Sequence, residues 1–170
     1  MSYDFTTIID RSACGSSKWE GMRKIDPDVG PDVLPMSTAD MEFLTAPEIR
    51  EGLKEFIDTV IQGYTGPTQA YFDAVLGWQK RRHGYEGKQE WIVTTSGVVP
   101  AIFMLVNLLT EPGDGVIIQQ PVYYPFSLAA KLSGRKLVNN ALIRKEDTYE
   151  MDFAGLEEMA RDPRNKVLIF

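Results

Sequence analysis

Metal-binding and redox-active residues are scarce in this sequence. Its 170 residues include a single cysteine, Cys14, and a single histidine, His83. One cysteine excludes an internal disulfide framework and a cysteine-based zinc cluster. One histidine argues against a His-rich metal site and against a Ser-His-Asp triad. The sequence therefore predicts no metal centre.

Basic charge and long hydrophobic runs are also lacking. Only 18 Lys and Arg residues oppose 24 Asp and Glu residues, a formal net charge of −6, and no basic block is present. Such a distribution is unsuited to neutralising nucleic-acid phosphates. The most apolar stretch, residues 98–109, is much shorter than the ~20 residues that cross a bilayer, and the N-terminal residues lack a secretory-signal pattern. We expect a cytoplasmic protein with no nucleic-acid partner and no membrane contact.

The composition that remains is typical of a soluble globular protein. Hydrophobic residues make up 44% of the chain, aromatic residues 11% and charged residues 25%. A chain of this kind has enough apolar surface to fold, which excludes intrinsic disorder. The length indicates one domain or a large fragment of a longer protein.

The first forty-odd residues are predicted to form an extended arm rather than a packed helix. Helix-interrupting residues occur close together there, at Pro27, Gly30, Pro31 and Pro35. Regular structure is predicted to begin at Thr45, which has the spacing of a capping box with Glu48. An amphipathic helix is expected behind it, ending at Gly63. A second helix is expected from Pro67 to His83, with Gly84 as its C-terminal stop.

From residue 91 onward, short apolar runs alternate with helical segments. Four strands are expected, at Trp91–Thr95, Gly115–Gln119, Lys136–Ile143 and Lys166–Phe170. Strand–helix alternation predicts an α/β fold with a parallel sheet covered on both faces. Since α/β proteins place binding groups just beyond such strands, and the last strand ends this sequence, we interpret the sequence as truncated.

The segment TTSGVVPA, residues 94–101, is a candidate anion-binding turn. A strand is expected to lead into Gly97, and a helix is expected to begin at once. The backbone amides of Gly97, Val98 and Val99 then point outward at the positive end of the helix dipole, an arrangement that binds phosphate. A plain strand-to-helix turn is the alternative, and the motif is neither GxGxxG nor a P-loop.

Tyrosines mark two further candidate sites. Tyr123 and Tyr124 lie between two prolines in QQPVYYPF, where a stiff loop can hold an aromatic ring against a planar ligand. Core packing is the alternative for Phe126 in the same motif. Tyr64 lies in GYTGP between the two expected helices. It is either a surface anchor or a hydroxyl donor to a phosphate held elsewhere, for example by a partner subunit.

Two features near the N-terminus have mainly structural interpretations. Asp40, in STADMEF, lies in an apolar setting and is predicted to cap a turn or a helix entry. Lys18 is next to Trp19, and the simplest interpretation is a lysine whose aliphatic stem covers a buried tryptophan.

Several motifs, taken in order along the chain, resemble those of one enzyme family: KWEGM, LPMSTADMEF, GYTGP, TTSGVVPAI, LTEPGDGVIIQQPVYYPF and YEMDFAGLE. The family is the cystathionine β-lyase (C–S lyase) branch of the fold-type-I pyridoxal-phosphate enzymes, which are relatives of the class I/II aminotransferases. The resemblance covers the whole sequence but only the N-terminal part of such enzymes. It implies that residues 1–44 form an N-terminal arm of the small domain. Residues 45–170 then form the first half of the large, αβα, cofactor-binding domain.

The resemblance also implies roles for particular residues. Gly97, Val98 and Val99 match the backbone cradle for the phosphate of pyridoxal 5'-phosphate (PLP). Tyr123 matches the aromatic residue stacked on the pyridine ring. Tyr64 matches a tyrosine that reaches the cofactor of the neighbouring subunit, which implies a homodimer. The segment that borders the substrate entrance is matched by Asp40, Met41 and Phe43.

The implied function is that of a PLP-dependent C–S β-lyase or aminotransferase acting on a small amino-acid substrate. Ser37 stands where the family commonly has a tryptophan, which alters the expected entrance. The family's Schiff-base lysine has no counterpart here, so no catalytic residue is assigned and the 170 residues alone are expected to be inactive. The alternative is a non-catalytic remnant with a binding or regulatory role. A flavodoxin-like nucleotide-binding domain fits the alternation but neither the arm nor the QQPVYYPF loop.

A strand order follows from the same resemblance. The strand at Gly115–Gln119 is expected in the middle, between Lys136–Ile143 and Lys166–Phe170. The strand at Trp91–Thr95 is expected to find no partner in this sequence. Pairing of that strand with the last one would contradict the resemblance.

Overall fold

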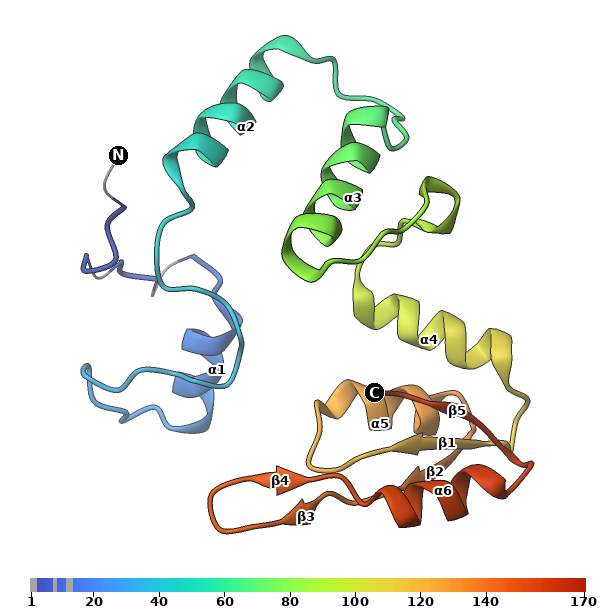
Figure 1. The fold of residues 1–170 in the computed structure, drawn as a ribbon. Helices are drawn as coiled ribbons and strands as arrows, with labels where there is room; N and C mark the ends of the chain where they lie inside the picture. Colours follow the sequence, from blue (N-terminus) through green and yellow to red (C-terminus); the bar gives the residue numbers. More distant parts are fainter. Residues whose placement is uncertain (1–2, 8, 12–13) are drawn as a thin grey trace. The chain divides into compact units, whose positions relative to one another are not determined.

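The computed structural model describes residues 3–7, 9–11 and 14–170 (Figure 1). The chain divides into two compact units, residues 1–66 and residues 67–170. Part of the predicted N-terminal arm, at residues 1–2, 8 and 12–13, lies outside the described residues. The predicted boundary at residue 44 concerns the domains of a longer enzyme and stays a prediction.

The first unit contains two helices, α1 (Ser17–Ile25) and α2 (Pro47–Thr59). The prediction of an arm without a packed helix is wrong, since α1 forms before the prolines that were expected to prevent it. Its charges suit a helix, because Glu20 is in the first turn and two basic residues are in the last turn. The prolines between residues 27 and 35 instead shape the irregular segment that follows.

The predicted capping box at Thr45 is also wrong. α2 begins at Pro47 with Ala46 as its N-cap, and no side chain caps it. Glu48 is therefore the second helical residue, one position too early for a reciprocal cap. Its Oε1 instead accepts a hydrogen bond from the Tyr3 hydroxyl at 3.3 Å. Proline itself suits this helix start, because its fixed φ and missing N–H cost nothing at the first position.

The second unit opens with α3 (Gln69–His83), close to its predicted bounds. The Thr68 hydroxyl accepts a hydrogen bond from the Tyr71 amide at 3.3 Å and caps the N-terminus. Gly84 ends the helix with a φ of 67°, a left-handed conformation that glycine adopts without a steric penalty.

Residues 91–95 do not form the predicted strand. A short 3₁₀ helix, η1 (Gln89–Trp91), precedes an extended segment in which Val93 is 83% exposed. Extended chain becomes a strand only when a neighbour satisfies its N–H and C=O groups. Within the described residues this segment joins no sheet, so it does not pair with the last strand. That outcome agrees with the expectation of a missing partner.

A three-stranded parallel sheet organises the second unit. β1 (Gly115–Ile118) lies between β2 (Lys136–Asn139) and β5 (Asn165–Leu168), which confirms the predicted strand order. α5 (Tyr124–Leu132) leads from β1 to β2, and α6 (Phe153–Arg161) leads on to β5. The first connection leads from β1 to β2 on one side of it, and the second leads from β2 back past β1 to β5 on the other side. Because parallel crossovers are right-handed, the two helices cover opposite faces of the sheet (Figure 1).

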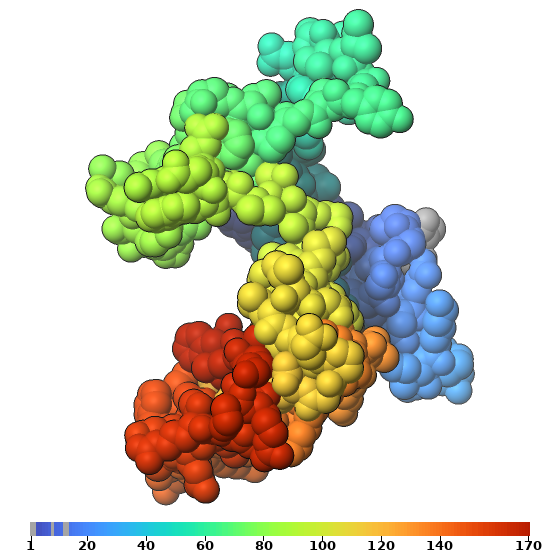
Figure 2. Space-filling view, turned by 90° about the vertical axis from the view of Figure 1, so that its right-hand side faces the viewer, coloured from blue at the N-terminus to red at the C-terminus, as the bar shows by residue number. Residues whose placement is uncertain are grey.

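Small and branched side chains form the core on one face of this sheet. α4 (Val98–Leu109) packs against α5. The buried cluster between them and β1 consists of Val106, Val116, Ala129 and Ala130. Part of α4 is uncovered, and this helix is exposed in yellow in Figure 2. Its exposed side chains include Val98, Met104, Leu105 and Leu108.

The predicted strand at Lys136–Ile143 is shorter than expected. β2 ends at Asn139, whose side chain accepts a hydrogen bond from the Gln120 amide at 3.1 Å. β3 (Ile143–Arg144) then turns back and pairs antiparallel with β4 (Tyr149–Glu150). α6 is capped by the Asp152 carboxylate, which accepts a hydrogen bond from the Gly155 amide at 2.9 Å. Among the described residues, no helix has both the length and the apolar character needed to span a membrane.

Candidate functional site

The N-terminus of α4 has the properties of an anion-binding turn. The first N–H groups of a helix have no acceptor within the helix, and here no side chain caps them. A residue that precedes the helix holds the turn in place, because the Thr95 hydroxyl donates a hydrogen bond to the Gly97 carbonyl at 3.0 Å. Gly97 has a φ of 159°, a conformation that other residues rarely adopt. The backbone amides of Gly97, Val98 and Val99 are therefore available to a ligand.

The loop with Tyr123 continues directly from the central strand. Tyr123 is the N-cap of α5 and is 56% exposed, with its ring edge-on to Tyr124 at a centroid distance of 5.3 Å. Phe126 contacts the same ring at 6.1 Å and is half-buried. The start of the loop is tied to the chain beyond β2, since the Leu142 amide donates to the Gln120 carbonyl at 2.8 Å. An exposed aromatic face is thus held on a fixed backbone.

Two buried amide side chains, which the sequence interpretation missed, support this end of the sheet. Gln119 Nε2 donates a hydrogen bond to Asn140 Oδ1 at 3.0 Å. Asn140 Nδ2 donates to the Asp152 carbonyl at 3.1 Å. Gln119 was the last residue of one expected strand and Asn140 lay inside another, so the signal was a polar amide within or at the end of an apolar run. In the structure each follows its strand directly, where ligand-binding loops of α/β sheets begin.

The turn at Gly97 and the loop with Tyr123 belong to one packed unit. Each lies at the N-terminus of a helix, α4 and α5 respectively, and those helices are held together by the buried cluster around Val106. Their predicted roles, a phosphate cradle at residues 97–99 and a ring stacked on a planar group at Tyr123, stay predictions. The available amides and the exposed ring fit a phosphorylated aromatic cofactor such as PLP.

Tyr64, in the first unit, is fully exposed. It follows α2 on a segment without regular structure. Full exposure is what a residue that serves a neighbouring subunit requires, and the predicted contact itself stays a prediction. Burial of Tyr64 within its own unit would instead have indicated a purely structural role.

Asp40 belongs to a charged cluster rather than to a turn cap. We call Arg11, Lys18, Asp40 and Glu42 the charged cluster. Lys18 is 5% exposed, and its ammonium lies 2.7 Å from Asp40 Oδ1 and also contacts Glu42 Oε1. Arg11 contacts Asp40 Oδ2 at 2.9 Å and Glu42 Oε1 at 3.2 Å. Lys18 therefore does more than cover Trp19 with its stem.

The charges in this cluster stabilise one another. Hydrogen bonds from Arg11 and Lys18 hold the pKa of the Asp40 carboxyl well below its usual range. The hydrogen bond from Lys18 also lowers the pKa of Glu42, with a smaller contribution from Trp19, whose Nε1 lies 3.2 Å from Glu42 Oε2. In return, Asp40 raises the pKa of Lys18. All of these groups are consequently charged at neutral pH.

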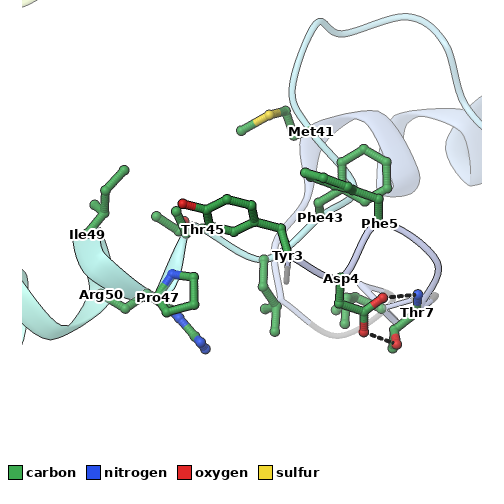
Figure 3. Close-up of a pocket in the computed structure, with 13 residues that line it drawn as sticks. Tyr3, Asp4, Phe5, Thr7, Met41, Phe43, Thr45, Pro47, Ile49 and Arg50 are labelled. Carbon is green, nitrogen blue, oxygen red and sulfur yellow. Dashed lines mark hydrogen bonds between the residues drawn. The ribbon is translucent and has the colours of Figure 1, made fainter. Parts of the chain in front are cut away.

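Met41 and Phe43 line an apolar cavity of about 450 Å³ in the first unit (Figure 3). Phe5 meets Phe43 edge-on at a centroid distance of 5.2 Å, and Tyr3 lies beside Phe5. Asp4 borders the cavity with its carboxylate bound to the amide and hydroxyl of Thr7. Of the three predicted entrance residues, the structure brings Met41 and Phe43 to the cavity but leaves Asp40 in the charged cluster.

The side chains of residues 40–43 divide between two surroundings. Asp40 and Glu42 contact the basic residues of the charged cluster, whereas Met41 and Phe43 line the cavity. Because the chain bends at residues 42 and 43, this separation does not follow from a strand-like alternation, and the sequence pattern did not reveal it. Across the described part of the chain, no group of three or more His, Cys, Asp or Glu side chains is arranged to hold a metal ion.

Comparison with known proteins connects these features to a family. The family model "Aminotransferase class I and II" matches residues 31–170. Cystathionine beta-lyase PatB of Bacillus subtilis (strain 168) is 46% identical over 132 residues, which cover 78% of this chain and 34% of PatB.

Two solved structures are similar in fold. Cystalysin from Treponema denticola, which contains a pyridoxal 5'-phosphate cofactor, matches with a TM-score of 0.95 and 49% identity over 99% of this chain and 43% of cystalysin. The PLP-bound C-S lyase from Staphylococcus hominis matches with a TM-score of 0.89 and 29% identity, over 100% of this chain and 43% of the lyase.

These similarities confirm the expected fold class and cofactor. The chain spans about a third of the length of PatB and less than half of each solved structure. The two solved relatives carry PLP, the cofactor predicted from the motifs. Their fold is the fold-type-I α/β fold, of which this chain covers part. The chain belongs to the aminotransferase class I and II family.

Proposed function

We propose that this chain supplies part of the cofactor site of a PLP-dependent C–S β-lyase of the cystathionine β-lyase type. The observation that carries the proposal is the uncapped N-terminus of α4, which offers backbone amides to an anion. The exposed ring of Tyr123 in the same unit supplies a face for a planar group. The names of PatB and the two solved relatives support lyase chemistry for the whole enzyme.

Each predicted cofactor residue has a defined task in this proposal. The amides of Gly97, Val98 and Val99 donate hydrogen bonds to the phosphate and thereby orient the cofactor. The Tyr123 ring covers one face of the pyridine ring and excludes water from it. The Tyr64 hydroxyl donates a hydrogen bond to the phosphate held by a second copy of the chain, so the enzyme is a homodimer. When bound, PLP supplies an electron sink for negative charge that develops at the substrate α-carbon.

The substrate in this proposal is a small sulfur-containing amino acid. Met41 and Phe43 present apolar surface at the cavity, which suits a thioether chain. No residue of this chain is assigned the proton transfer, because none of its lysines lies in a motif matching the family's. The 170 residues by themselves are therefore proposed to bind the cofactor without covalent attachment and without turnover.

Transamination is the second candidate, and the description of the matching family favours it. Both reactions require removal of the same α-proton, so the residues described above serve either one. The two differ in their products. A β-lyase converts cystathionine and one water molecule into a thiol (homocysteine), ammonia and pyruvate, whereas an aminotransferase passes the amino group to a keto acid.

The test uses the full-length enzyme that contains this sequence, loaded with PLP. Cystathionine is added, and pyruvate and free thiol are measured beside amino-group transfer to a keto acid. Pyruvate and thiol in equal amounts support the lyase. Transfer to the keto acid without free thiol would replace it by the aminotransferase. In parallel, borohydride treatment of the 170 residues with PLP tests covalent attachment, and stoichiometric labelling of one lysine would contradict the proposal.

A further inference from the structure

The charged cluster holds the backbone of the Asp40–Phe43 segment as well as its side chains. Lys18 Nζ donates a hydrogen bond to the Asp40 carbonyl oxygen at 2.9 Å, in addition to its ion pairs. Arg11 Nη1 donates to the Met41 carbonyl oxygen at 3.3 Å. Two consecutive carbonyls and the two carboxylates around them are therefore bound by two cations that come from earlier in the chain.

Burial makes these contacts more costly to break than those of an ordinary surface ion pair. The Lys18 side chain is 5% exposed and that of Arg11 is 20% exposed, whereas the Lys54–Glu51 pair on α2 has both side chains more than 60% exposed. A buried ammonium has lost most of its hydration, so its partners must replace the lost water contacts. Moving the segment away from Lys18 would leave a buried charge uncompensated.

The same contacts occupy both carboxylate oxygens of Asp40. Oδ1 lies 2.7 Å from Lys18 Nζ and 3.2 Å from Arg11 Nη1, and Oδ2 lies 2.9 Å from Arg11 Nη2. The carboxylate is thus already neutralised within its own unit. It has no excess negative charge to offer to the ammonium group of an amino acid.

We infer that Lys18 and Arg11 are positioning residues for the substrate entrance, and that Asp40 acts through them rather than by touching the substrate. The cluster holds the two carboxylates and the carbonyls of Asp40 and Met41, and thereby keeps Met41 and Phe43 at the cavity. This inference rests on the proposed function for the meaning of the cavity. The resemblance to the C–S lyase family implied no role for Arg11 or Lys18.

The first test measures the segment itself in the 170-residue protein. Lys18→Met removes the charge at similar length, Lys18→Arg restores it, and Lys54→Met is the matched control on an exposed ion pair. Amide hydrogen exchange of residues 40–45 is followed by mass spectrometry. Lys18→Met is expected to speed exchange there about tenfold or more, while Lys18→Arg and Lys54→Met stay near wild type. Unchanged exchange in Lys18→Met would overturn the inference.

The second test measures substrate binding in the full-length enzyme. Lys18→Met is expected to raise the KM for cystathionine about tenfold with kcat and PLP affinity retained. A lower kcat with unchanged KM would indicate a structural role only and would overturn the inference. If wild-type enzyme has no lyase or aminotransferase activity, the proposed function fails, and the exchange measurement alone decides whether the cluster holds the segment.

A double-mutant cycle separates positioning by Asp40 from direct contact. Because Asp40 acts through the cluster, Lys18→Met combined with Asp40→Asn is expected to change KM no more than the larger single change. Multiplying effects would show that Asp40 touches the substrate independently and would overturn its assignment. Should Lys18→Met fail to fold, as judged by circular dichroism, Asp40→Asn alone carries the exchange test, with faster exchange at residues 40–45 expected and unchanged exchange overturning the inference.

Discussion

Gln119 Nε2 donates a hydrogen bond to Asn140 Oδ1 at 3.0 Å, and both side chains are buried. Gln119 directly follows β1 and Asn140 directly follows β2, so the bond joins the ends of two neighbouring parallel strands. Asn140 also donates to the carbonyl of Asp152, the N-cap of α6. Three elements therefore meet at one amide, at the start of the loop that carries Tyr123.

Replacing this amide should destabilise the second unit. Asn140→Leu keeps a similar volume but leaves the buried Gln119 donor without an acceptor and the Asp152 carbonyl with only the Leu156 amide. The free energy of unfolding is expected to fall by about 2 kcal/mol, measured by urea denaturation with circular dichroism. Gln120→Ala, at an exposed neighbour, is the control and should change stability by less than about 0.5 kcal/mol. Equal stability of the two variants would contradict the role given to Asn140.

Cofactor affinity should depend on the backbone at Gly97. Gly97→Ala forces a side chain into a φ of 159°, which shifts the amides away from the phosphate. PLP binding, followed by absorbance titration, is expected to weaken about tenfold. Gly52→Ala makes the same change in α2, where the added carbon meets nothing within 4 Å, and should leave affinity unchanged. Weaker binding in both variants would mean that the loss is not specific to the turn.

The ring of Tyr123 should matter more than its hydroxyl. Tyr123→Ala removes the stacking face and is expected to weaken PLP binding about three- to tenfold, whereas Tyr123→Phe should bind within about twofold of wild type. Tyr149→Ala, at a similarly exposed tyrosine, is the matched control. Fluorescence titration distinguishes the four proteins. A loss in Tyr123→Phe as large as in Tyr123→Ala would shift the role to the hydroxyl.

Low pH should weaken the contacts that hold residues 40–43. The pKa of Asp40 is lower in the folded protein than in the unfolded chain, where it lies at about 3.9. A depressed carboxyl pKa stabilises the folded state fully above the unfolded value, and this contribution is lost as the pH falls through the folded value. Exchange protection at residues 40–45 should therefore persist at about pH 5 and decline below about pH 4.

Asp40→Asn is the comparison for this pH dependence. The variant lacks one of the two carboxyls whose pKa the cluster lowers, so its protection should be lower at neutral pH and should vary less between about pH 5 and pH 2. A decline that begins near neutral pH in the wild-type protein would contradict the assignment, since neither carboxyl of the cluster titrates there.

Features set by neighbouring residues were predictable from the sequence. The end of α3 follows from Gly84 and its start lies two residues after the expected Pro67, because such signals act within a few residues. The cap of α6 by Asp152 is equally local. The same is true of the helix start at Gly97 and of the motif around Tyr123, which are two of the six motifs that together identified the family. Apolar runs also located β1 and β5, since a buried parallel strand needs little but continuous hydrophobicity.

The wrong predictions concern elements whose bounds or pairing depend on residues other than those of the predicted motif. Thr45 and Glu48 have the spacing of a cap, yet the N-cap is Ala46, one residue later, because Pro47 suits the first helical position. Residues 91–95 have the composition of a strand, yet no neighbour supplies hydrogen bonds within the described part of the chain. Composition alone carries no information on whether such a neighbour is present.

The sequence by itself determined the family, the cofactor and the alternation of helices and strands, because these depend on short motifs and local periodicity. Only the tertiary structure decided that Lys18 meets Asp40 across 22 positions and that Gln119 meets Asn140 across 21. A buried polar group takes whichever partner the fold brings within hydrogen-bond distance. That choice depends on how distant segments pack, and no local pattern records it.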